Sequence, residues 1–462
     1  MAFPPIEGSQ GVAQYAQNRQ YQYFKNPTFI YPIIPATFVS MVMTQPNHEL
    51  MWVDAVAEEI SPLDFGKLII DMKPDYIVFE ANTMLINRYY EIIDGLKSQL
   101  PDIKVILCGE HLTALPEEVK GKCKADHFIE GGKWHEKAYE IVSKGRWPEG
   151  SPLPHINRDV TRWWLYGYRN GNFKRVPGTY TMASQDCWYR PRQACTFCSW
   201  VNYHPEYKVR DVGEFLLEIE ELINKGFREF FDDSGTFPVG KWLHEFCTEM
   251  IERGYNKHIQ WGCNMRFGVL NKEDFELMSK AGCRFILWGF ESANQKTLDE
   301  LSKGYKIECV QQDLILSRTN GIWNHLTVMM GYPWETIEEE RRTFKMVKWL
   351  MLNDWAASCQ STIFMPYPGT ESFRRCKEQG QILTEDWSKW DIANQVVKLK
   401  YDFKEALKLQ RDYYNISYHW KFIFNKLKMV KSLDDLKYYF RLGRKVVDRF
   451  GNIHDGGKVG ID

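Results

Sequence analysis

The chain has 462 residues, 44% of them hydrophobic and 26% charged, and its formal net charge is −1. This length suits two or three domains with ordinary cores, and the balanced charge excludes the global basic field typical of nucleic-acid-binding proteins. The 11 cysteines are scattered, unlike a small secreted disulfide framework. Because we see neither a secretory leader nor a run of about 18 apolar residues, we expect a cytoplasmic protein without a transmembrane segment.

The N-terminal part of the chain alternates between helical and extended patterns. Residues 1–30 are rich in Gln, Asn and Tyr and lack periodicity, so we expect an extended arm. Residues 31–145 predict a Rossmann-like domain with a parallel sheet, because strands there alternate with helices. The predicted helices cover 34–43, 61–72 and 84–100, and the predicted strands cover 48–56, 74–82, 103–111 and 125–132.

Polar and small residues follow three of these strands. Ligands of open parallel sheets bind beyond the carboxyl ends of the strands, which makes these loops candidate binding loops. Polar loops end the strands of any α/β domain, so the pattern alone identifies no ligand. The candidate residues are Glu80, Asn82, Thr83, Gly109, Glu110, His111, Thr113, Gly131 and Gly132.

A connector rich in Pro and Gly, residues 146–178, leads to a second repetitive region at 179–400. Amphipathic helical stretches, such as 214–226 and 241–254, separate its strands, which is typical of a TIM-like barrel with its chemistry at the carboxyl ends of the strands. The predicted strands are 179–185, 228–233, 258–264, 284–291, 325–331 and 360–366.

Three cysteines lie close together after the first of these strands, in the run DCWYRPRQACTFCSW. A cubane iron–sulfur cluster normally takes four thiolates, so Cys187, Cys195 and Cys198 would leave one iron open to substrate atoms. The alternatives are a zinc site, although no second cysteine pair follows to close it, or a chance grouping of buried thiols. The cysteines alone do not decide between these readings.

The downstream motifs favour the cluster. In order they are CTFCSW, FFDDSGTF, WGCNMR, AGCRFILWGFESANQKTL, KG, MMGYPWET and MPYPGT. Together they resemble the radical S-adenosylmethionine (SAM) superfamily, in its branch with an N-terminal cobalamin-binding domain, from about residue 31 to about residue 450. One departure is the spacing, because seven residues separate Cys187 from Cys195 where the family usually has three. The resemblance implies a Rossmann-like cobalamin domain, a partial (β/α)6 barrel and a C-terminal helical cap.

The resemblance also implies roles for single residues. Cys187, Cys195 and Cys198 would hold a [4Fe-4S] cluster, and the candidate binding loops would face cobalamin. An Asp-x-His-x-x-Gly motif is absent, which argues against a histidine ligand on cobalt. For some residues there is an alternative to contact with SAM. These alternatives are helix capping for Asp233 and Ser234, a surface ion pair for Arg266 and core packing for Tyr367. The residues that would contact SAM are Phe197, Asp233, Ser234, Gly235, Arg266, Glu291, Ser292, Gly331 and Tyr367.

The activity implied by the resemblance is reductive cleavage of SAM to a 5′-deoxyadenosyl radical, most concretely for cobalamin-dependent methylation of an unactivated carbon. Radical cyclisation, oxidation or carbon–carbon coupling without methyl transfer is the alternative, and an iron–sulfur sensor or scaffold is the alternative of another class. The implied partners are an electron donor such as flavodoxin or ferredoxin and a small-molecule, lipid or peptide substrate, without nucleic acid.

The last segment, 401–462, is predicted to be a helical domain with a tail, rich in aromatic and basic residues. It would close the barrel mouth. Its Lys and Arg excess could attract an acidic substrate, anionic lipid or a carrier protein, but a solvated helix face over an aromatic core is the favoured interpretation.

Overall fold

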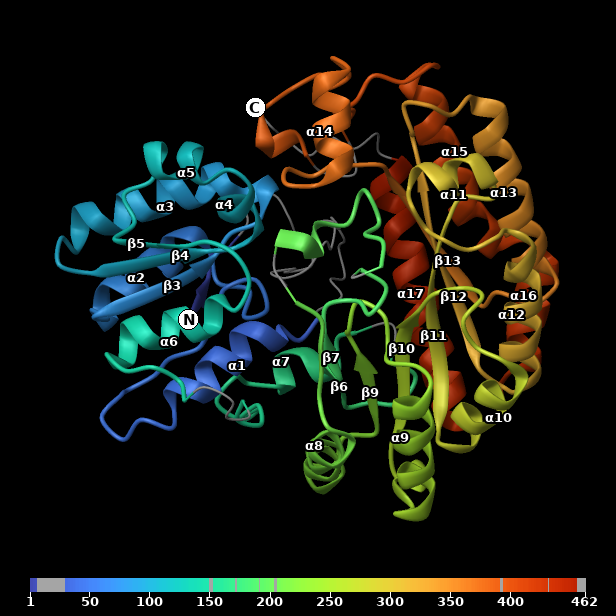
Figure 1. Ribbon diagram of the computed structural model, residues 1–462, viewed down its shortest axis with the longest axis horizontal. Coiled ribbons are helices and arrows are strands. Elements are labelled where there is room, and N and C mark those ends of the chain that lie inside the picture. Colours follow the sequence, from blue (N-terminus) through green and yellow to red (C-terminus); the bar gives the residue numbers. More distant parts are fainter. Residues whose placement is uncertain are drawn as a thin grey trace.

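The computed structural model describes residues 1–5, 30–148, 153–170, 173–190, 192–202, 206–390, 394–430 and 432–454. Figure 1 shows two α/β bodies side by side, the smaller N-terminal one in blue and cyan and the larger one in green to red. Among the described helices, none is both long enough and apolar enough to cross a bilayer.

The N-terminal body contains a three-stranded parallel sheet in the order β3, β4, β5. Alternate residues of β4 pack into two different core clusters, so helices cover both faces of the sheet. The strands are β3 (Tyr76–Glu80), β4 (Lys104–Cys108) and β5 (His127–Ile129). The helical elements are α1 (Ile33–Val42), α2 (Pro62–Met72), η1 (Thr83–Leu85), α3 (Ile86–Gln99), α4 (Glu110–Ala114), α5 (Pro116–Lys122) and α6 (Trp134–Ser143).

The strand predicted over 48–56 is wrong in extent and in partner. Only β2 (Val53–Asp54) is extended, and it pairs with β1 (Ala2–Phe3) outside the three-stranded sheet. A turn that ends at Glu59, with φ +59°, follows directly and stops the strand. Because Ala2 and Phe3 are buried, the first residues of the predicted arm belong to this domain; its residues 6–29 lie outside the described part.

The larger body is a half barrel of six parallel strands in the order β13, β12, β11, β10, β9, β6. Neighbouring strands of the sheet are therefore successive strands of the barrel, as repeated β/α units require. The strands are β6 (Gly178–Thr181), β9 (Glu229–Asp232), β10 (Gln260–Met265), β11 (Cys283–Glu291), β12 (Trp323–Met330) and β13 (Ser358–Ile363). The helices of this body are α8 (Val212–Asn224), α9 (Lys241–Glu252), η3 (Tyr255–Lys257), α10 (Lys272–Lys280), α11 (Gln295–Glu300), α12 (Glu308–Thr319), α13 (Ile337–Leu352) and α14 (Glu371–Glu378).

The first barrel strand is shorter than the predicted 179–185. After β6 the chain turns, because the backbone N–H of Ala183 donates to Asp232 Oδ2 at 2.7 Å. It then forms β7 (Ser184–Gln185), which pairs antiparallel with β8 (Lys208–Val209). The cysteine run, with η2 (Ser199–Asn202), lies between these two short strands.

Helix capping residues explain several boundaries of the barrel helices. Thr336 and Glu339 form a reciprocal capping box at the start of α13, and Asn271 with Asp274 does the same for α10. These boundaries are readable in the sequence because the capping side chains lie three residues apart.

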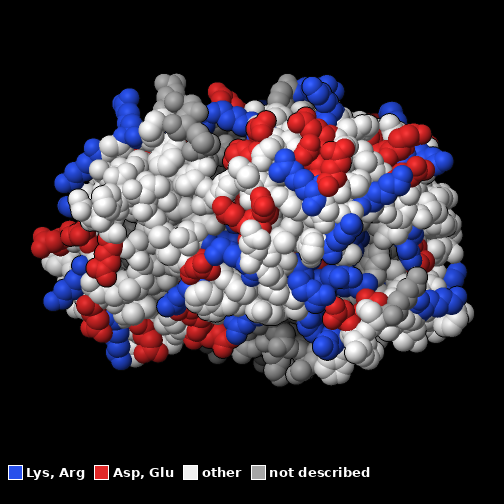
Figure 2. Space-filling view, turned by 90° about the horizontal axis from the view of Figure 1, so that it is seen from below, with Lys and Arg blue, Asp and Glu red and all other residues white. Residues whose placement is uncertain are grey.

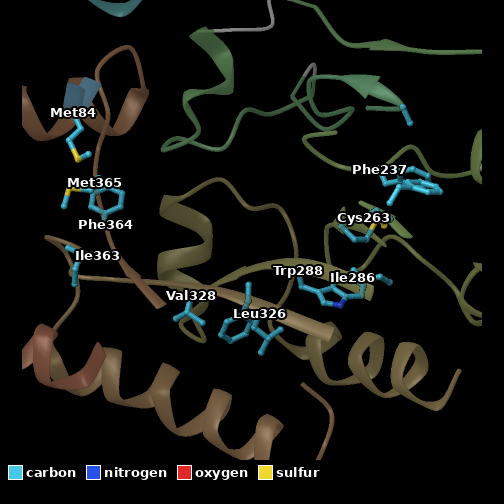
Figure 3. Close-up of a cluster of buried hydrophobic side chains, with 14 of the residues drawn as sticks. Met84, Phe237, Cys263, Ile286, Trp288, Leu326, Val328, Ile363, Phe364 and Met365 are labelled. Atoms are coloured by element: carbon cyan, nitrogen blue, oxygen red, sulfur yellow. The ribbon is translucent and has the colours of Figure 1, made fainter. Parts of the chain in front are cut away.

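One hydrophobic core joins the half barrel to the N-terminal domain. Leu326 and Val328 of β12 lie with Ile286 and Trp288 of β11 between the strands and the helices that run below them in Figure 3. In the same cluster, Met84 of η1 lies beside Met365, which follows β13. The two bodies are thus packed together rather than only tethered.

The connector between the bodies, 146–178, is partly built into this packing and contains α7 (Trp164–Gly167). Buried Arg158 forms an ion pair with Glu218 of α8, with Nη2 and Oε1 2.6 Å apart. Burial by itself would raise the pKa of Glu218, but the charges of Arg210 and Arg158 lower it to about 2. The connector therefore anchors the barrel at a charged contact.

The C-terminal helices are not at the predicted place. Helix α15 packs on α13 and β13, and α16 packs on α13. Helix α17 lies against the starts of the strands, where Asp434 pairs with Arg228 at 2.8 Å, ahead of β9, and Tyr438 packs on Trp323. The described contacts of these helices thus lie on the outside of the half barrel and, for the first turns of α17, at the end opposite the cysteines. These elements are η4 (Trp387–Lys389), α15 (Phe403–Asn415), η5 (Ile416–Tyr418), α16 (Trp420–Lys428) and α17 (Leu433–His454).

Acidic and basic side chains are interspersed on the face seen from below in Figure 2. This pattern agrees with the net charge of −1.

Candidate functional site

The first cysteine is fixed at the carboxyl end of the sheet. Cys187 follows β7 and pairs with Thr236, which follows β9, and Sγ of Cys187 lies 3.0 Å from Thr236 Oγ1. A Cβ added to Gly235 would lie 3.0 Å from Cys187 Cβ. A residue without a side chain is therefore needed at 235 for the two loops to approach this closely.

The other two cysteines lie on a turn that two other segments hold in place. The backbone N–H of Cys198 donates to the Cys195 carbonyl at 3.2 Å. Between them, the N–H of Thr196 donates to the Leu301 carbonyl at 3.1 Å, and the Thr196 carbonyl accepts from the N–H of Ser372 at 2.8 Å. The turn is thus bound to the loop after α11 and to the start of α14.

The three thiols form one electrostatic group. Burial raises the pKa of the Cys187 and Cys198 thiols, and the charge of Cys195 raises both further. Cysteine side chains are the ligands that iron–sulfur clusters take as thiolates. Among the described residues, no three His, Cys, Asp or Glu side chains are grouped closely enough for a single metal ion. The fit to a cluster rests on the donor set, since Cys195 and Cys198 share one turn and Cys187 begins the same loop.

Arg266, just beyond β10, lies beside the cysteine turn. Its Nη1 is 3.7 Å from Sγ of Cys195, and its guanidinium carbon is 3.4 Å from the centre of the Tyr189 ring. It also donates to the Lys303 carbonyl. Tyr189 is one of the seven residues between Cys187 and Cys195, so Arg266 ties this longer loop to the barrel. Contact between Arg266 and the SAM carboxylate stays a prediction.

Asp233 and Ser234 lie where the sequence placed them, after β9. Ser234 Oγ accepts from the backbone N–H of Ser184 at 2.8 Å, and Asn264 Nδ2 is 3.5 Å from Asp233 Oδ1. Both residues are buried. Neither residue caps the next helix, because α9 begins at Lys241 and its N-cap is Gly240.

Glu291 ends β11 in a left-handed conformation, with φ +64°. Its Oε1 lies 3.1 Å from Nζ of Lys303, and both side chains are buried. The same ammonium lies 5.8 Å from the centre of the Phe197 ring. The structure therefore brings Phe197 and Glu291 together through Lys303, which the sequence analysis did not select. The only signal was the KG motif.

The remaining predicted SAM contacts are more dispersed. Ser292 donates to Glu335 Oε1 at 3.0 Å inside a buried polar cluster with Thr343. Gly331, with φ +80°, donates its N–H to Glu340 at 2.6 Å. Tyr367 is partly buried, with its ring 6.5 Å from that of Trp390. Contact of Ser292, Gly331 and Tyr367 with SAM remains a prediction.

The loops of the N-terminal domain meet the cysteine turn directly. Ser199, the residue after Cys198, donates to Glu110 Oε2 at 2.8 Å. Burial raises the pKa of Glu110 to about 7, although this hydrogen bond and one from the Thr83 backbone lower it. The carboxyl end of β4 is thus in contact with the cysteine-bearing loop.

The other candidate residues of these loops are tied to one another. Thr113 Oγ1 accepts from the backbone N–H of Gly131 at 2.9 Å, which joins the loops after β4 and β5, and Gly132 follows directly. Asn82 caps η1 by accepting from the Leu85 N–H.

Two residues of this region are deeply buried and polar. Glu80 accepts from Trp134 Nε1 at 3.1 Å, and burial raises its pKa well above the ordinary value. Burial lowers the pKa of His111 to about 4, so the ring is neutral at pH 7. The His111 ring lies 5.0 Å from that of Trp387, and neither ring nitrogen has a hydrogen-bond partner among the described residues.

The half barrel thus carries three partly exposed cysteines in one loop at the carboxyl ends of its strands. Residues 185–347 match the family model of the radical SAM superfamily. The matched segment is a radical SAM domain, and the chain that carries it is a radical SAM enzyme. Its cofactors accordingly include a [4Fe-4S] cluster and SAM.

Relatives match most of the chain at low identity. An uncharacterized methyltransferase of Pyrococcus horikoshii is 25% identical over 399 residues, which are 80% of this chain and 84% of the relative. The anaerobic magnesium-protoporphyrin IX monomethyl ester cyclase of Cereibacter sphaeroides is 26% identical over 385 residues, 76% of this chain but only 60% of the relative.

A solved structure shares the fold over most of both chains. The radical SAM methyltransferase TsrM of Kitasatospora setae, with cobalamin and a [4Fe-4S] cluster bound, has a TM-score of 0.60 and 15% identity, covering 80% of this chain and 75% of its own. The predicted α/β architecture is confirmed.

Proposed function

We propose that Cys187, Cys195 and Cys198 hold the cluster and that the enzyme uses cobalamin to methylate an unactivated carbon. The observation that carries the proposal is the 2.8 Å bond from Ser199 to Glu110. Because Ser199 directly follows a proposed cluster ligand, and Glu110 lies on a predicted cobalamin loop, the two predicted cofactor sites adjoin. Such adjacency is needed when both cofactors act on one substrate.

When bound, the cluster supplies the electron that cleaves the SAM sulfonium, and cobalamin carries the methyl group. The protein residues position and shield these groups. Arg266 holds the long cysteine loop through Tyr189, and the buried Glu291–Lys303 pair supplies a fixed polar wall beside Phe197. We propose that Asp233 and Glu291 bind SAM through its amino group and its ribose, respectively.

Radical cyclisation without methyl transfer is the second candidate, because one relative is named a cyclase and the other a methyltransferase. For either reaction we propose a cytoplasmic enzyme that receives electrons from a flavodoxin or ferredoxin. Its substrate would be a small molecule, a lipid or a peptide.

Anaerobic reconstitution of the full chain with iron, sulfide and hydroxocobalamin tests both parts of the proposal. We expect about four irons per chain, cobalamin that stays bound through desalting, and 5′-deoxyadenosine after addition of dithionite and SAM. Cys198→Ala and Cys187→Ala should each lose the cluster absorption, whereas Cys247→Ala, a buried thiol in α9, should retain it.

Full SAM cleavage by Cys187→Ala would show that the ligand set is wrong. Loss of all cobalamin on desalting, with SAM cleavage intact, would favour the cyclisation alternative.

A further inference from the structure

Large apolar side chains are exposed on two consecutive C-terminal helices, α16 and the first turns of α17. Isolated exposed apolar residues are normal, but a group of this size marks an interaction surface. We call this group the apolar face. Its members, with their exposed fractions, are Trp420 72%, Ile423 44%, Phe424 51%, Leu427 64%, Leu433 75%, Leu436 57% and Phe440 67%.

The apolar residues of α16 share one side of the helix. They are spaced at three, four and seven residues, which places them along one stripe. The opposite side faces α13, because Lys421 Nζ donates to Asn353 at 3.0 Å and Asn425 Nδ2 donates to the Leu352 carbonyl at 3.2 Å. The stripe therefore points away from the protein.

Helix α17 has the same arrangement. Asp434 and Asp435 pair with Arg228 and Lys174 of the barrel body, at 2.8 and 2.5 Å, and Tyr438 is buried. Leu433, Leu436 and Phe440 consequently occupy the outer side. Near the junction of the helices, Tyr439 Oη lies 3.5 Å from Met429 Sδ, which keeps the two helices together.

The charges near the apolar face have one sign. Lys428 and Lys437 are exposed among the apolar residues, and Lys428 Nζ lies 4.3 Å from the centre of the Phe424 ring. Helix α16 contains no acidic residue, and the acidic residues at the start of α17 are turned toward the barrel body, as their ion pairs show. The outer surface thus combines aromatic and aliphatic side chains with lysines.

We propose that the apolar face docks the enzyme on an anionic phospholipid bilayer. Interfacial helices of this composition lie in the membrane plane, with apolar side chains among the acyl chains and lysines reaching the phosphates. The face lies at the strand-start end of the half barrel, since α17 contacts Arg228 ahead of β9. Docking leaves the cysteine loop at the opposite end free. The proposal is independent of the proposed function.

Vesicle co-sedimentation of the full chain tests the proposal, with phosphatidylcholine vesicles that contain or lack phosphatidylglycerol. The wild type should bind the anionic vesicles, and Leu427→Asp/Leu433→Asp should weaken binding by roughly tenfold or more. Leu63→Asp, which alters a 68% exposed leucine at the start of α2, is the matched control and should bind as the wild type does. Lys428→Gln/Lys437→Gln should lower binding to anionic vesicles by roughly tenfold.

Circular dichroism confirms that each variant is folded. Absence of wild-type binding to anionic vesicles would overturn the proposal, and so would equal binding by Leu427→Asp/Leu433→Asp. A wild-type dimer that this variant converts to monomers, without vesicle binding, would instead assign the apolar face to a second copy of the chain.

Discussion

At the scale of single residues, the charged groups near the cysteine loop are held in pairs. Lys303 is buried against Glu291 and approaches Phe197, and its carbonyl accepts from Arg266. A buried carboxylate that keeps its partner is tolerated, but one that loses it remains as an uncompensated charge. Lys303 therefore supports both the end of β11 and the cysteine turn.

Lys303→Met should lower the free energy of unfolding by about 3 kcal/mol, because it strands the Glu291 carboxylate. The double variant Lys303→Met/Glu291→Gln should recover most of the loss, since no buried charge is left. Urea unfolding of the wild type and the two variants measures these differences. An unchanged midpoint in Lys303→Met would contradict the argument.

At the scale of elements, the loops at the carboxyl ends of the strands differ in how much space they have. Gly109 has φ +120°, and a Cβ built there would lie 2.2 Å from the Ala81 carbonyl oxygen. Gly131 has φ +79° but nothing within 4 Å of such a Cβ. Both loops carry predicted cobalamin residues, yet only the loop after β4 is pressed against its neighbour.

Gly109→Ala should destabilise the protein by about 3 kcal/mol, because a strained backbone is combined with a backbone clash. Gly131→Ala should lower the free energy of unfolding by only about 1 kcal/mol, which is the penalty for placing alanine in the left-handed backbone conformation. Urea unfolding of both variants gives the comparison. Equal losses would mean that the contact with Ala81 relaxes without cost.

At the scale of the whole molecule, a titratable contact joins the two bodies. Burial raises the pKa of Glu110 from 4.5 to about 7, and its partner Ser199 lies on the cysteine loop. The folded state therefore favours the protonated carboxyl. The contribution of the Glu110 carboxyl to the free energy of unfolding is complete below pH 4.5 and is lost as the pH rises through about 7.

Glu110→Gln should remove this dependence while keeping an acceptor for Ser199. Relative to the wild type, the free energy of unfolding of the variant should be higher by up to about 3 kcal/mol at pH 8 and unchanged near pH 4.5. Unfolding midpoints at the two pH values test the prediction. If the unfolding midpoints of variant and wild type differ by the same amount at both pH values, Glu110 is excluded as the titrating group.

The extent to which the sequence predicted these features depends on the range of the interactions. The barrel strands and the order of the motifs were predictable, because periodicity and capping are local, as Thr336 and Glu339 illustrate. Three features were not: the pairing of Val53 with Ala2, the position of α17 and the role of Lys303. Each depends on a partner far away in the chain, for example Asp434 on Arg228. A single sequence contains no signal for such pairs.

Helices α4 and α5 are held from two directions. Ser199 bonds to Glu110 on one side, and on the other Trp387 donates to Glu118 at 2.8 Å and packs on His111. A bulky ligand that enters between the two bodies has to wait until one of these contacts opens. Its association should therefore be slow, first order at saturating ligand, and limited by fluctuations of the protein rather than by collisions.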